Sequence, residues 1–163
     1  MANGAAVRRP PPGGRWAPVR SAVMSDYAIV DPDDVKDSYA GSDVPGEFRR
    51  LTRALRAEQL AATLIRIPPH SDFEQGTGHF HDEVEELYLV TRGTLTMRFG
   101  DDVRAVGPGS AVRVAPRTPR SHRNEGDEPV ELWAVSRRLD GDGGNKIDDF
   151  WEASPQAVQR RDG

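Results

Sequence analysis

The stretch GHFHDEVEELYLVTRG, residues 78–93, is the part of the chain that decides the fold. His79 and His81 are separated by one residue, and Glu86 follows after four more. Side chains alternate between the two faces of a β-strand, so the two imidazoles point to one face. Their α-carbons lie roughly 6.6 Å apart at about 3.3 Å per residue. Two imidazoles at this spacing can converge on one ion, and Glu86, at the start of the next predicted strand, can add a carboxylate.

Short strands broken by turns are predicted along most of the chain. Residues 60–67 have the alternating side chains of a strand and stop at Pro68 and Pro69. Further strands are expected at residues 48–55, 86–92, 94–99, 103–106, 111–115, 121–124 and 130–136. Many short strands with little helix between them are typical of an all-β sandwich, jelly roll or barrel.

Four segments need separate interpretation. Residues 27–30 are expected to form a short strand, and the acidic residues 31–37 a helical turn. Residues 55–64 contain good helix formers, but the surrounding strands favour a strand there too. Residues 148–158 are expected to form a terminal helical turn, with Phe150 and Trp151 docking on the barrel.

Composition indicates one domain and excludes several chemistries. The chain has 163 residues, which suits one domain, and residues 1–23, rich in Pro, Gly and Arg, are expected to be a disordered tail. It has no cysteine, so disulfides, thiolate metal sites and a cysteine nucleophile are excluded. No apolar run reaches the roughly 20 residues of a membrane helix, and no apolar segment follows the N-terminal arginines. Without such segments we expect a cytoplasmic protein with no membrane partner, and the net charge of −4 argues against a nucleic-acid partner.

The spacing in residues 78–93 resembles the first motif of the cupin superfamily. That motif has His-x-His, three or four residues, Glu, six residues and Gly, and His79, His81, Glu86 and Gly93 match it. The Gly that usually lies six positions before the first His is replaced by Phe73. The resemblance extends over residues 49–137 and implies a double-stranded β-helix, a jelly-roll barrel, over residues 24–145. A partly helical C-terminal segment, residues 146–163, is expected to follow.

The second cupin motif is altered. It usually runs Pro-x-Gly, two residues, His, three residues, Asn, and Asn124 sets the register in this chain. Arg120 then stands where the third histidine is usual, and His122 lies two residues further along the same strand face. Arg120 can be a salt-bridged surface residue or can clamp a carboxylate or phosphate with its planar fork. The alignment favours the clamp.

The resemblance predicts a divalent transition ion held by His79, His81 and Glu86. Iron, manganese, zinc, nickel and copper are all compatible with such ligands. The candidate ligand-binding residues in the barrel cavity are Arg120, His122, Tyr88 and Trp133, although for Tyr88 and Trp133 core packing is the favoured interpretation.

Three functions follow as hypotheses. The protein is a metal-dependent enzyme such as a small oxygenase or isomerase, a binding module for a small, anionic molecule, or a metal-free barrel that serves in assembly. Small single-domain cupins are often homodimers, and an open sheet edge needs cover, so residues 48–64 are expected to pair across a two-fold axis. The fold alone does not choose among these functions.

Overall fold

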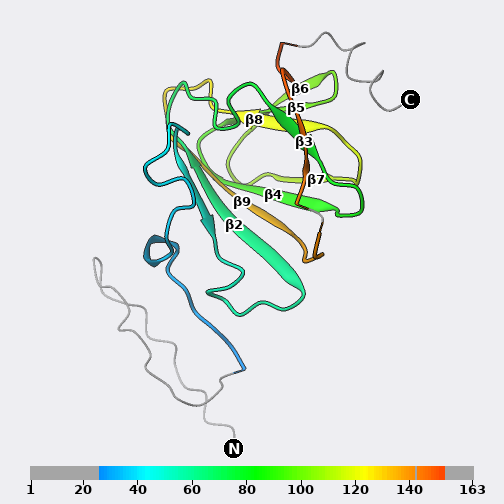
Figure 1. Cartoon of the computed structure of the whole chain (residues 1–163). Helices are drawn as coiled ribbons and strands as arrows, with labels where there is room; N and C mark the ends of the chain where they lie inside the picture. Colours follow the sequence, from blue (N-terminus) through cyan, green and yellow to red (C-terminus); the bar gives the residue numbers. More distant parts are fainter. Residues whose placement is uncertain (1–25, 142, 153–163) are drawn as a thin grey trace, which may run out of the picture.

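The computed structural model describes residues 26–141 and 143–152 and is almost entirely β (Figure 1). Within these residues there are one 3₁₀ helix, η1, and ten strands. Their bounds are η1 Pro32–Asp34, β1 Glu47–Arg50, β2 Leu60–Ile67, β3 Gly78–Phe80, β4 Glu86–Arg92, β5 Leu95–Phe99, β6 Asp102–Val106, β7 Ala111–Val114, β8 Arg120–Arg123, β9 Val130–Arg137 and β10 Asn145–Ile147.

The strands form two antiparallel five-stranded sheets. The first has the order β1-β2-β9-β4-β7 and the second β10-β3-β8-β5-β6. In Figure 1, β2, β9 and β4 lie in the lower layer and β8, β5 and β6 in the upper one. Inward-facing apolar side chains of both sheets fill the space between them, among them Ile65, Tyr88, Met97 and Leu132. Period-two alternation therefore places one face of each sheet in a common core.

The predicted all-β fold is confirmed, but the sheets do not close into a barrel. No strand pairing joins the edges of the two sheets in the described residues, so the molecule is an open sandwich. Residues 27–30 do not form the expected strand, whereas η1 forms within the expected acidic turn, capped by Asp31. Strand rather than helix is confirmed for residues 60–64, which begin β2, whereas residues 55–59 form a turn and bend instead of a strand.

The prediction of a C-terminal helix is wrong for the residues that the structure describes. Residues 145–147 form β10, which pairs with β3, and residues 148–152 form turns. The backbone hydrogen-bonding groups of 145–147 are used in the sheet, so a helix does not start there. Residues 153–158 of the expected helical turn, and the expected disordered tail at 1–23, lie outside the described residues.

Phe150 and Trp151 dock on the second sheet, as expected. Phe150 is fully buried, and the guanidinium of Arg98 lies 4.9 Å from its ring centroid. Trp151 Nε1 donates to Ser121 Oγ at 2.8 Å. Gly78 makes room for this packing, because a Cβ at that position would lie 2.6 Å from Phe150 Cγ. The described residues contain no helix of the length and apolarity needed to cross a membrane.

Candidate metal centre

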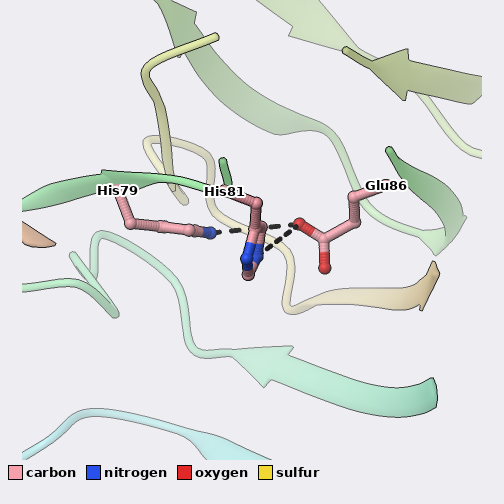
Figure 2. A group of neighbouring side chains, drawn as sticks. All are labelled: His79, His81 and Glu86. Atoms are coloured by element: carbon pink, nitrogen blue, oxygen red, sulfur yellow. Dashed lines mark ion pairs between the residues drawn. The ribbon is translucent and has the colours of Figure 1, made fainter. Parts of the chain in front are cut away.

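The two sheets contribute different ligands to one cluster. His79 lies in β3, and His81 follows directly after it, whereas Glu86 begins β4 in the opposite sheet. Glu86 Oε2 lies 3.9 Å from His79 Nε2 and 3.8 Å from His81 Nε2 (Figure 2). One ligand atom from each residue lies within 4.8 Å of the others. Atoms bound to one ion at about 2.0–2.2 Å lie about 3–3.5 Å apart, so a small inward shift would complete a three-ligand site.

Backbone contacts hold both histidines in place. His79 is paired with Lys146 of β10 on one side and with Arg120 of β8 on the other. The carbonyl of His81 accepts a hydrogen bond of 2.7 Å from the backbone N–H of Arg117. The imidazole positions are therefore set by sheet pairing and by one loop contact rather than by the side chains alone.

Glu74 completes the cluster, and sequence reasoning missed it. Its Oε1 lies 2.8 Å from His79 Nδ1, and its Oε2 accepts a hydrogen bond of 3.1 Å from the backbone N–H of His122. The side chain of Asp72 caps the same turn by accepting from the N–H groups of Glu74 and Gly76. The contact at Nδ1 leaves Nε2 of His79 facing Glu86. The only sequence signal was an acidic residue in the turn before β3.

Arg120 points into the site and is fully buried. Its Nη2 donates to Glu86 Oε2 at 2.5 Å, and its Nε donates to Tyr88 Oη at 3.3 Å. The Tyr88 hydroxyl also donates to Glu86 Oε2, at 2.5 Å. The oxygen of Glu86 that faces both imidazoles is therefore the oxygen that these two donors share.

The surrounding groups hold Glu86 ionised. Burial opposes ionisation, but the neighbouring imidazole of His79, the charge of Arg120 and the donation from Tyr88 outweigh burial and lower the pKa of Glu86 to about 2. Burial also disfavours the charged form of His79, but the nearby carboxylates of Glu74 and Glu86 prevail and raise its pKa. Burial first, and then the charge of Glu86, raise the pKa of Tyr88 well above its ordinary value, so its hydroxyl is a donor.

His122 and Tyr88 line a cavity of about 1250 Å³ together with the metal-site cluster. His122 is 1% exposed, stacks on Phe73 with ring centroids 5.9 Å apart, and has no hydrogen-bond partner for either ring nitrogen among the described residues. Its Nδ1 lies 3.7 Å from Glu74 Oε2, but burial lowers its pKa and favours the neutral ring. A polar group without a partner inside a cavity is available to a ligand.

Trp133 is not among the cavity-lining residues. It lies opposite Leu64 and Leu89 in the sheet register, whereas the next residue, Ala134, faces the cavity. Because side chains alternate along β9, Trp133 lies on the outer face of the first sheet. The structure therefore brings Arg120, His122 and Tyr88 together and leaves Trp133 outside the site.

Comparison with known proteins agrees with this architecture. The family model described as "Cupin domain" matches residues 63–136, the region that carries the cluster. The chain contains a cupin domain. No curated protein matches the chain.

Solved structures share the cupin fold at low sequence identity. A sugar phosphate isomerase of the cupin superfamily from Silicibacter pomeroyi is 24% identical, with a TM-score of 0.58 over 69% of this chain and 76% of that chain. The polyketide cyclase RemF from Streptomyces resistomycificus is 19% identical, with a TM-score of 0.60 over 81% and 92%. A predicted oxalate decarboxylase from Thermotoga maritima is 19% identical, with a TM-score of 0.55 over 68% and 99%. These similarities concern the fold.

Proposed function

We propose that this cupin domain binds a divalent transition ion through His79, His81 and Glu86 and holds a small anionic molecule in the adjoining cavity. One observation carries the proposal: two imidazole nitrogens and a carboxylate oxygen from opposite sheets lie within 4.8 Å of one another at the wall of a cavity. Neutral nitrogen and carboxylate oxygen ligands suit iron, manganese, zinc, nickel or copper.

The residues of the cluster fit such an ion in type, spacing and ionisation. Three protein ligands leave coordination positions open, and an ion bound there supplies Lewis acidity or, for a redox metal, electron transfer. Glu74 holds His79 through Nδ1 and keeps Nε2 directed at Glu86. Such contacts behind the ligands typically set the tautomer and orientation of an imidazole.

The proposed ligand is small and anionic. The cavity is lined by six lysines and arginines and by three glutamates, so positive charge prevails at its walls. Two of these glutamates are already engaged, Glu74 with His79 and Glu86 with Arg120. The neutral, unpartnered imidazole of His122 offers a further polar contact to a bound molecule.

A metal-free function is the second candidate, and Arg120 favours it. Arg120 stands where a third imidazole would complete the ligand set, and its cation lies 2.5 Å from the oxygen of Glu86 that a metal would need. A cation at that distance repels a divalent ion and competes for the oxygen's lone pairs. In this alternative the domain binds its ligand, or serves in assembly, without catalysis.

Elemental analysis of purified protein separates the two candidates. Wild type, His79→Ala, His81→Ala and Glu86→Gln are each offered zinc, manganese, iron, nickel and copper at neutral pH and then desalted. We expect wild type to retain stoichiometric metal, both histidine variants to lose it, and Glu86→Gln to be weakened less. Circular dichroism of the two histidine variants should be unchanged, because these side chains lie outside the apolar core. Equal metal contents in wild type and a double histidine variant would leave the metal-free function.

A further inference from the structure

Four arginines border the opening of the cavity and form what we call the arginine rim: Arg50, Arg53, Arg56 and Arg137. All four line the cavity and are exposed to solvent, which places them at its mouth. None of the four has an ion pair with a carboxylate among the described residues, whereas Arg49, Arg66, Arg104, Arg113, Arg120 and Arg123 each do.

The fold gathers these arginines from separate segments. Arg50 is paired with Thr63 in the β1–β2 register, on the face of the sheet that lines the cavity. The turn after β1 carries Arg53 and Arg56 and is closed by the N–H of Leu55, which donates to the carbonyl of Leu51 at 2.8 Å.

The end of β9 joins the same region. The N–H of Arg138 donates to the carbonyl of Gln59 at 2.8 Å, directly after Arg137. Arg137 itself is paired with Leu60, the first residue of β2. The end of β1, the following turn, the start of β2 and the end of β9 thus meet at one edge of the cavity.

The positive charge of the rim exceeds the negative charge of the free carboxylates that line the cavity. Three glutamates line the cavity: Glu58, Glu74 and Glu86. Glu74 already contacts His79 and Glu86 already pairs with Arg120, so Glu58 is the remaining one. Lys146, which also lines the cavity, pairs with Asp148 at 2.7 Å. A chain with a net charge of −4 therefore concentrates unpaired cations at one opening. Like charges held together repel, and such a field attracts anions into the cleft that it borders.

We propose that the arginine rim binds the phosphate or carboxylate group of the molecule that the cavity holds. Arg120 is a poorer receptor for that charge, because Glu86 already neutralises it. Guanidinium groups bind both oxyanions in bidentate fashion with charge-assisted hydrogen bonds. The rim thereby orients the ligand, with its anionic end at the mouth and its other end toward His122 and the histidine cluster. This inference deepens the proposed function but does not require a metal for the anionic contact.

Calorimetric titration of metal-free protein with inorganic phosphate and with malonate tests the rim, and glycerol serves as the neutral control. The protein is treated with chelator and kept at low ionic strength. We expect wild type to bind at least one of the two anions and not glycerol. The variant Arg53→Gln/Arg56→Gln should bind about tenfold more weakly or worse, since it loses charge-assisted hydrogen bonds to the anion. The variant Arg50→Gln/Arg137→Gln provides the same test from the neighbouring strands.

The control variant Arg92→Gln/Arg104→Gln removes the same charge from exposed arginines outside the cavity. We expect it to bind as wild type does. Equal weakening in rim and control variants would overturn the proposal in favour of bulk electrostatics, and absence of binding to both anions would overturn it outright. Retained binding in His79→Ala/His81→Ala supports the rim even if the metal site fails. Anion binding that requires added metal and has the same affinity in wild type and the rim variants would contradict the proposal.

Discussion

Arg120 donates through Nη2 to Glu86 Oε2 at 2.5 Å, and the guanidinium that makes this contact is fully buried. The pair joins β8 of one sheet to β4 of the other. Removing one partner of a buried pair leaves an uncompensated charge, which costs several kcal/mol. The position of Arg120 thus affects both the ionisation of the carboxylate and the strength of any metal site.

Arg120→His should tighten metal binding. The change removes a cation beside Glu86 and places an imidazole next to His79 in the sheet register. We expect the dissociation constant for zinc or manganese to fall by about tenfold or more, the scale on which contacts around metal ligands act. Calorimetric titration at neutral pH measures it. Arg104→His, at an exposed position outside the cavity, is the matched control, and equal affinities in both variants would show that Arg120 does not oppose the metal.

Glu74→Gln should weaken metal binding without abolishing it. Glutamine cannot supply the carboxylate that holds His79 Nδ1, so the ring loses its fixed tautomer and orientation. The expected loss of affinity is about 10–100-fold. Glu85→Gln, which alters an exposed carboxylate paired with Arg113, should bind metal as wild type does. Metal affinity that does not change in Glu74→Gln would remove Glu74 from the site.

The unfolding free energy of the metal-free protein should decrease as the pH is lowered. We expect this decrease to be smaller in Glu86→Gln than in wild type. The pKa of Glu86 is about 2 in the folded state against 4.5 for the free side chain, so the unfolded state binds the proton more tightly. The stabilisation is present above about pH 4.5 and disappears as pH falls toward about 2. Between about pH 5.5 and pH 3 the loss attributable to Glu86 is on the order of 2 kcal/mol.

His79, whose pKa is raised, affects stability in the opposite direction. Its contribution to the unfolding free energy is complete below the pKa of the unfolded state and is lost as the pH rises through the higher pKa of the folded state. Urea titrations across the acidic range compare wild type with Glu86→Gln. Parallel pH profiles of the two proteins would contradict an ionised Glu86 stabilised by its neighbours.

Gly78→Ala should destabilise the fold. The added Cβ would lie 2.6–2.7 Å from ring atoms of Phe150 and 3.0 Å from the carbonyl oxygen of Arg120, and both lie in packed surroundings. Overpacking of this kind costs about 1–3 kcal/mol. Urea unfolding measures the change, with Gly107→Ala as control, because no atom lies within 4 Å of its added Cβ. Equal stabilities of the two variants would mean that Phe150 does not hold its place against the second sheet.

The homodimer remains a prediction, with pairing expected through residues 48–64. β1 is an edge strand of the first sheet, with one side free to pair in the described residues. Light scattering over a range of micromolar concentrations should report about twice the 17.9 kDa of one chain. A mass of one chain throughout this range would exclude pairing through β1.

The local spacing of residues was sufficient to predict much of the fold and the three proposed metal ligands. The one-residue spacing of His79 and His81 predicts a shared direction, and the structure brings both to Glu86. Gly93 matches the glycine of the first cupin motif, and its φ of +69° is a conformation that glycine adopts without strain. Both inferences rest on geometry set by neighbours in the chain.

The sequence by itself therefore determined most of the strands, the inward face of β3 and the His-His-Glu cluster, because strand alternation and turn preferences act over a few residues. Only the tertiary structure decided the partners of these groups. Glu74 reaches His79 from a turn, Arg120 meets Glu86 across the two sheets, and Trp133 faces outward. These relations depend on the packing of two sheets and on strand register, which couple residues far apart in the chain and leave no periodic signal in it.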